Sequence, residues 1–162
     1  MGQLLNEGLN YLLKEYIAQK RPHDHLGDGY GMPSSHSQFI WYFAIYGSLY
    51  MKRYIHLDHS VWKQLVSLAM FALAILVSFS RVYLGYHTTY QVMAGSLVGA
   101  LFGMAWYQLC QWIHSSGLVE VVLNTPLAKK LYLRDMSFVK NVARWEYEQW
   151  CQLQKERNSK KN

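Results

Sequence analysis

Basic, hydroxyl and imidazole side chains cluster at three places in the first ninety residues. The clusters are Lys14 with Arg21-Pro22, Pro33-Ser34-Ser35-His36, and Ser80-Arg81 with His87. Lys14 and Arg21 are two helical turns apart, about 10 Å along a helix axis, so their long side chains can converge on one anion. Serines that follow a proline at the start of a helix offer backbone N–H groups and a positive dipole end to a phosphate. Arg81 follows another helix end and adds a third cation, so the pattern predicts an anion site, and a phosphate suits it.

Each cluster also has an ordinary structural explanation. A lysine or arginine near a helix end anchors the helix at a membrane interface, and a serine before a helix is a common N-cap. Arg81 is then a snorkelling residue, and the histidines are interfacial. These alternatives stay open for any single cluster. All three clusters nevertheless fall on one side of the predicted membrane, and that coincidence favours a common site.

Long uncharged segments carry these clusters. The chain has 162 residues, of which 51% are hydrophobic and 15% aromatic, and residues 64–80 and 92–110 contain no charged side chain. Segments of this length and composition span a bilayer as helices. We predict membrane helices over residues 37–51, 61–79 and 88–112, and the fold class is therefore all-α.

Another helix and a loop precede the first span. Apolar side chains recur at helical spacing between residues 4 and 17, with polar side chains opposite them. The apolar positions are Leu5, Leu9, Leu12 and Leu13, and the polar ones are Asn6, Glu7 and Asn10. Residues 23–32 are rich in glycine and aspartate, which predicts a loop.

Three glycines repeat every four residues in the last predicted span: Gly95, Gly99 and Gly103. Small residues at this spacing let a neighbouring helix approach closely and favour helix–helix self-association. The alternative is chance glycine in an apolar run.

The distribution of basic residues orients the predicted spans. Twelve of the sixteen Lys and Arg residues fall on the membrane side opposite the three clusters. Cytoplasmic segments carry such an excess, so the clusters are expected to face the lumen or the exterior. Topology accounts for the net charge of +6, and no nucleic-acid partner is predicted. Cys110 and Cys151 lack the spacing of a metal site or a disulfide framework.

The three clusters together resemble the type 2 phosphatidic acid phosphatase superfamily, whose pattern is K-x6-R-P, then P-S-G-H, then S-R-x5-H-x3-D. In this chain Ser35 replaces the glycine of the second motif, and Gln91 occupies the acidic position of the third. Residues 30–39 and 80–91 are similar to the dolichyldiphosphatase branch of the superfamily, and both replacements look like features of that branch. The resemblance covers nearly the whole chain and implies an all-α, integral-membrane helix bundle of the phosphatase and haloperoxidase type.

The resemblance also implies a reaction. His87 would take the terminal phosphate of dolichyl diphosphate as a phosphohistidine, with His36 as general acid and then base. Gln91, one helical turn beyond His87, can accept a hydrogen bond from its ring. The side chains implied to hold the phosphoryl oxygens are Lys14, Arg21, Ser34, Ser35 and Arg81. No metal or cofactor is expected.

The implied setting is the endoplasmic reticulum membrane, with the site facing the lumen. The expected partners are a polyprenyl diphosphate lipid substrate and membrane lipids. The expected role is recycling of the lipid carrier for protein N-glycosylation.

Other functions are compatible with the same motifs. Soluble vanadate-binding haloperoxidases share the phosphate pocket, but the uncharged spans argue against that class. A phosphatase for phosphatidate or another lipid phosphate is a second alternative, because the spans do not determine the lipid tail. A third is a catalytically inactive, truncated membrane form that acts as an interaction partner, since superfamily members have membrane helices before the segment that opens this chain.

We expect two parts in the chain. Residues 1–115 form the membrane phosphatase core, without the N-terminal helices of the superfamily, and residues 116–162 form a basic cytoplasmic tail. A helix is predicted around residues 138–153, either on the membrane surface or in solvent. His23, Asp24 and His25 suggest a metal site, but solvated or substrate-edge histidines are favoured. No role is predicted for His56, His59 and His114.

Overall fold

The part of the chain that the structure describes is built from helices and contains no strand. The computed structural model describes residues 1–23, 29–55, 60–137, 139 and 141–159. Its helices are α1 (Gly2–Ile17), α2 (Ser35–Tyr54), α3 (Ser60–Tyr83), α4 (Thr89–Ser115), α5 (Leu118–Leu123), α6 (Pro126–Lys130) and α7 (Val142–Ser159). The predicted all-α class is confirmed. The three predicted spans correspond to α2, α3 and α4. Helices α2 and α3 extend beyond the predicted segments at both ends, whereas α4 begins one residue later than predicted and ends three residues later.

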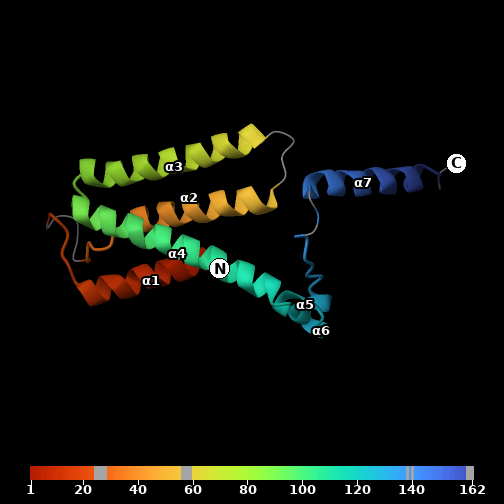
Figure 1. Cartoon of the computed structure of the whole chain (residues 1–162), viewed down its shortest axis with the longest axis horizontal. Coiled ribbons are helices and arrows are strands. Elements are labelled where there is room, and N and C mark those ends of the chain that lie inside the picture. Colours follow the sequence, from red (N-terminus) through yellow and green to blue (C-terminus); the bar gives the residue numbers. More distant parts are fainter. Residues whose placement is uncertain (24–28, 56–59, 138, 140, 160–162) are drawn as a thin grey trace.

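Helix α2 is the centre of the bundle. It packs against α1, α3 and α4, and α4 also contacts α1 and α3. The chain reverses direction between successive helices. The C-terminal ends of α1 and α3 and the N-terminal ends of α2 and α4 therefore gather at one end of the bundle, at the left of Figure 1. The three sequence clusters all lie at this end.

The glycine stripe of α4 lets this helix approach the backbone of α2. Gly95, Gly99 and Gly103 are all buried. A Cβ atom at Gly95 would lie 2.5 Å from the carbonyl oxygen of Ser34, and one at Gly99 would be closer still to the carbonyl oxygen of Gln38. The predicted close approach is present, but the neighbour is α2 of the same chain. The expectation of self-association through this stripe is corrected, because α2 already covers it.

Helix α1 buries its polar face rather than its leucines. Asn6 and Asn10 are 0% and 3% exposed, whereas Leu5 and Leu12 are 53% and 65% exposed. Both asparagines make hydrogen bonds with α2, which offset the cost of burying the bonded atoms, whereas Nδ2 of Asn6 has no partner among the described residues. Polar side chains that face the bundle interior, with apolar ones outward, are typical of a helix surrounded by lipid.

Two helices are long and apolar enough to cross a membrane, namely residues Val61–Tyr83 and Thr89–Ser115. Among the described residues, the predicted span in α2 does not reach that hydropathy. Its place in the bundle explains this difference. Helix α2 lies among three other helices and carries polar side chains such as Gln38 that bond to α1, so it needs less apolar surface than a helix facing lipid.

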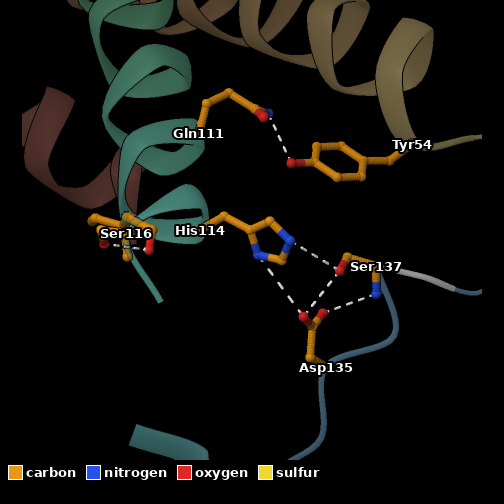
Figure 2. A network of polar contacts seen from close by, with 7 residues as sticks. Tyr54, Gln111, His114, Ser116, Asp135 and Ser137 are labelled. Atoms are coloured by element: carbon orange, nitrogen blue, oxygen red, sulfur yellow. Dashed lines mark hydrogen bonds and ion pairs between the residues drawn. The ribbon is translucent and has the colours of Figure 1, made fainter. Parts of the chain in front are cut away.

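The tail is attached to the end of α4 that lies away from the three clusters. Figure 2 shows Nδ1 of His114 3.8 Å from the Asp135 carboxylate, and Nε2 of the same ring 3.2 Å from Oγ of Ser137. Nearby, Gln111 donates a hydrogen bond of 2.8 Å to the Tyr54 hydroxyl of α2. Beyond this point α7 extends away from the bundle in Figure 1 and, within the described residues, contacts no other helix.

Several expected features fall partly or wholly beyond the described residues. The predicted tail helix is present as α7, although it starts at Val142 and residue 138 is outside the described ranges. The interpretation of Asp24 and His25, and the positions of His56 and His59, also lie outside them.

Substitution of Gly99 by alanine should destabilise the bundle. The added methyl group would meet the Gln38 main chain, a neighbour that cannot rotate away. We expect a loss of about 1–3 kcal/mol in the free energy of unfolding, measured by denaturation in detergent. Gly8→Ala is the matched control, because no atom lies within 4 Å of its added Cβ. A Gly99→Ala variant as stable as the Gly8→Ala variant would contradict the packing of α4 on α2.

Candidate active site

A tight turn between α3 and α4 places His87 beside the end of α3. Gly85 has a φ of 70°, a conformation that glycine adopts without a steric penalty. The main-chain N–H of His87 then donates to the Arg81 carbonyl at 3.2 Å. The turn therefore brings Arg81 and His87 of the third sequence cluster to the same place.

The side chain of Gln91 is held in one orientation by two main-chain groups. Its Oε1 accepts a hydrogen bond of 3.2 Å from the N–H of Thr88, and its Nε2 donates one of 2.9 Å to the carbonyl of Lys20. A main-chain N–H only donates and a carbonyl only accepts, so these contacts establish which end of the amide is oxygen. Gln91 has no exposed surface.

The orientation of Gln91 decides the tautomer of His87. Nδ1 of His87 lies 3.2 Å from Oε1 of Gln91. Because that oxygen only accepts, Nδ1 carries the proton of the neutral ring, and Nε2 keeps its lone pair. The expected contact between Gln91 and His87 is thus present, and it leaves one ring nitrogen available as a nucleophile or base.

His87 is held in its neutral form. Burial lowers its pKa below the ordinary value of 6.5, and the positive charges of Arg21 and Lys14 lower the pKa further. The hydrogen bond to Gln91 and the main chain of Gly31 act in the opposite direction without reversing the shift. The unfolded chain therefore takes up this proton at a higher pH than the folded chain. Protonation of His87 consequently costs stability as the pH falls below 6.5.

Gln91 also ties the loop after α1 to the start of α2. The main-chain carbonyl of Gln91 accepts a hydrogen bond of 3.0 Å from the N–H of Ser34. Within the loop, the N–H of Gly31 donates a hydrogen bond of 2.7 Å to the main-chain carbonyl of Gln19. A Cβ atom at Gly31 would lie only 2.7 Å from Nε2 of Gln91. Any side chain at position 31 would therefore clash with Gln91, and glycine avoids this clash. The second sequence cluster is thereby fastened beside the third.

The serine hydroxyls of the second cluster are engaged inside the protein. Ser34 has no exposed surface and accepts a hydrogen bond of 3.2 Å from Ser37. Ser35 donates a hydrogen bond of 2.8 Å to Oδ1 of Asn10. Ser34 occupies the N-cap position of α2 but makes no side-chain capping bond. The Ser34 side chain therefore does not cap the first-turn N–H groups of α2, which suits an anion at this helix start, and His36 in the same turn is exposed.

Three cations act on the imidazoles electrostatically. Burial lowers the pKa of His36, and the positive charges of Arg81, Lys14 and Arg21 lower it further. Those of Arg21 and Lys14 also act on His87 and on each other. Arg81 is steadied by Tyr86, whose ring centre lies 5.3 Å from the guanidinium carbon. Lys14 and Arg21 thus act on both imidazoles, and Arg81 acts on His36, at the end of the bundle where the three sequence clusters lie.

Comparison with known proteins agrees with this arrangement. A family model described as the PAP2 superfamily matches residues 3–115. The chain belongs to the PAP2 superfamily. It is 39% identical over 156 residues to Dolichyldiphosphatase 1 of Homo sapiens and 36% identical over 149 residues to Dolichyldiphosphatase of Saccharomyces cerevisiae. It is also 32% identical over 167 residues to Lipid phosphate phosphatase gamma of Arabidopsis thaliana.

These alignments cover 90%, 83% and 98% of this chain, and 65%, 59% and 72% of the respective relatives. The chain thus spans about two thirds of the length of the human relative. No solved structure matches it. The predicted membership of the superfamily, with its likeness to dolichyldiphosphatases, is confirmed.

Some parts of this PAP2 site were not predicted from the sequence. The capping box formed by Thr88 and Gln91 has a readable signature, a threonine followed three residues later by a glutamine. The carbonyl of Lys20 and the close approach of Gly31 have no such signature. The sequence placed Asn10 on the polar face of a helix but did not predict its contacts with α2. Among the described residues, no group of three or more His, Cys, Asp or Glu side chains is arranged to hold a metal ion.

Nitrogen-15 NMR in detergent should show His87 as the Nδ1–H tautomer at pH 7. We expect its titration midpoint below the ordinary value of 6.5, because burial disfavours the imidazolium. In Gln91→Leu the acceptor is absent, so the preference for Nδ1–H should weaken. His87→Gln identifies the signal. A His87 ring protonated on Nε2 at pH 7 would contradict the assigned geometry.

Proposed function

We propose that the chain hydrolyses the terminal phosphate of dolichyl diphosphate, yielding dolichyl phosphate and inorganic phosphate. The observation that carries this proposal is the His87 ring, held by Gln91 with Nε2 unprotonated, at the end of the bundle where three cations converge. The names of the human and yeast relatives support the choice of substrate. Their similarity covers nearly all of this chain.

His87 is proposed as the nucleophile. Its Nε2 lone pair forms an N–P bond with the terminal phosphorus, while the bond from that phosphorus to the bridging oxygen breaks and leaves its electron pair on the oxygen. Burial and the positive charges of Arg81, Lys14 and Arg21 lower the pKa of His36, so the negative charge of the bound diphosphate has to favour its imidazolium form. That imidazolium protonates the bridging oxygen and releases dolichyl phosphate. Neutral His36 then takes a proton from a water molecule that attacks the phosphohistidine. The N–P bond breaks, and its electron pair returns to Nε2.

The three cations are proposed to stabilise the transferring phosphoryl group. Lys14, Arg21 and Arg81 come from different elements, and the uncapped N–H groups at the start of α2 add a fourth positive region. Preorganised charges of this kind favour the transition state because they need no rearrangement as its charge develops. Ser34 and Ser35 then contribute through the main chain at this helix start, while their hydroxyls hold the surrounding structure together.

The site is proposed to face the lumen of the endoplasmic reticulum. It lies at the end of the bundle opposite Lys52, Arg53 and the basic tail. An excess of basic residues favours the cytoplasmic side, which leaves the phosphate site on the other side. Residues 1–115 are then the catalytic part and residues 116–162 a cytoplasmic tail. This placement is consistent with recycling of the lipid carrier for protein N-glycosylation.

Hydrolysis of another lipid phosphate is the second candidate. It is favoured by the similarity to the Arabidopsis protein, which covers 98% of this chain and is named a lipid phosphate phosphatase. Comparison of dolichyl diphosphate, dolichyl phosphate and phosphatidate as substrates separates the two candidates. Preference for a monophosphate would overturn the proposal in favour of this alternative.

His87→Ala should lower kcat for dolichyl diphosphate in detergent by at least about 10³-fold, because the variant lacks the nucleophile. Gln91→Ala should cost about 10- to 100-fold, the equivalent of losing one buried hydrogen bond. His114→Ala is the control, because this histidine lies at the C-terminal end of α4, whereas His87 precedes its N-terminal end. Phosphate release that survives His87→Ala would refute the nucleophile, and equal losses in the two variants would refute an orienting role of Gln91.

Hydrolysis should persist in excess chelator. The charge that a divalent cation supplies in many phosphoryl-transfer enzymes is provided here by Lys14, Arg21 and Arg81. Rates measured with and without EDTA should therefore agree. Loss of activity in EDTA, restored by magnesium, would show that these side chains do not suffice.

A further inference from the structure

Asparagines rather than apolar side chains hold α1 against α2. The buried residues of α1 are Gly2, Asn6 and Asn10, which follow one another at one-turn intervals along a single face. Half-buried Lys14 is the next residue on that face. The position of Lys14 therefore depends on how the two asparagines engage α2.

A directed chain of hydrogen bonds runs through this interface. Ser35 donates to Oδ1 of Asn10 at 2.8 Å, and Nδ2 of Asn10 donates to Oε1 of Gln38 at 2.7 Å. Nε2 of Gln38 donates at 2.9 Å both to Oδ1 and to the main-chain oxygen of Asn6. Nδ2 of Asn10 also lies 3.4 Å from the carbonyl oxygen of Pro33. The main-chain oxygens of Pro33 and Asn6 can only accept hydrogen bonds. They therefore fix which atom donates and which accepts in every hydrogen bond of this network.

This direction has a consequence for Ser35. A hydroxyl has a single proton, and that of Ser35 is donated to Asn10. Ser35 therefore ties the start of α2 to α1 and does not donate to a phosphoryl oxygen. Without this chain, no buried apolar side chain of α1 would resist sliding along α2. A slip of one turn would displace Lys14 by about 5.4 Å, more than its contact with an anion allows.

We propose that Asn10 is a positioning residue, which sets the register of α1 on α2 through Ser35 and Gln38 and so places the Lys14 ammonium at the phosphate site. The charge of Lys14 acts on both His36 and His87, as this placement requires. The inference rests on the proposed function only in taking the site to bind phosphate.

Equilibrium dialysis of inorganic phosphate against the 162-residue chain in detergent tests this inference. Asn10→Leu should raise the phosphate Kd about tenfold, as expected when one charged contact is displaced. Lys14→Ala should raise it by a similar factor. Adding Asn10→Leu to Lys14→Ala should then change little, because Asn10 acts through Lys14. A purely structural role of Asn10 would lower the unfolding temperature and leave the Kd of the folded protein unchanged.

Two matched controls accompany these variants. Asn6→Ala leaves Gln38 its bond to the main-chain oxygen of residue 6, so its effect on the Kd should be smaller than that of Asn10→Leu. Ser48→Ala removes a buried hydroxyl of α2 for which no hydrogen-bond partner is found among the described residues, and its Kd should match the unsubstituted chain.

Asn10→Asp keeps the test decisive if Asn10→Leu does not fold. A protonated carboxyl is isosteric with the amide and has one donor and one acceptor, so it reproduces the bonds to Gln38 and Ser35, whereas the carboxylate has no donor. We therefore expect the ratio of the phosphate Kd of Asn10→Asp to that of the unsubstituted chain, measured at the same pH, to rise as the pH rises. A relative Kd independent of pH would overturn the inference.

The remaining outcomes also decide the question. An unchanged Kd for Asn10→Leu, or fully additive losses in the double variant, would overturn the role of Asn10. An unsubstituted chain that binds no phosphate would overturn it as well. A chain that binds phosphate and shows the expected coupling, but releases no phosphate from dolichyl diphosphate, would refute only the proposed function.

Discussion

The buried amide of Gln91 is the interaction on which the site depends. Its oxygen accepts from Thr88 and His87, its nitrogen donates to Lys20, and it has no access to water that could replace a lost partner. An unsatisfied buried group of this kind costs about 1–3 kcal/mol, so the turn before α4 and the loop after α1 are held together. A carboxylate at position 91 would place an oxygen, which cannot donate, against the Lys20 carbonyl. The contact with Lys20 therefore explains why glutamine suits this position, where the superfamily motif has an acidic residue.

The bundle around the site is assembled in two different ways. Helices α2 and α4 approach closely because glycines leave room for the opposing main chain. Helices α1 and α2 are joined by hydrogen bonds between buried side-chain amides. Both kinds of contact suit a bundle surrounded by lipid, where outward apolar side chains do not drive helices together. The amide contacts between α1 and α2 hold the helix ends that carry Lys14 and His36 at fixed positions relative to each other.

The electrostatics of the site follow from this assembly. Cations from three elements act on the two imidazoles, and the described residues contain no group of three or more His, Cys, Asp or Glu side chains arranged to hold a metal ion. Burial and the neighbouring positive charges disfavour the imidazolium of His87, so its ring is suited to nucleophilic attack near neutral pH. A bound phosphate would neutralise part of the positive charge of Lys14, Arg21 and Arg81. The repulsion among these cations would then decrease, which favours anion binding at this site.

Local patterns in the sequence were sufficient to predict α1 to α4 and α7, the contact of Gln91 with His87 and the superfamily, but not the short helices α5 and α6. These features depend on spacing within a few turns of one helix or on motifs with a characteristic order. Only the tertiary structure decided that α1 turns its asparagines inward, that Gly95, Gly99 and Gly103 pack on α2, and that Ser35 donates to Asn10. Periodicity shows that a helix has two faces, whereas the face that is buried depends on the partner helix and on the surrounding solvent. A hydroxyl or amide likewise acquires its role from partners that are distant in the sequence.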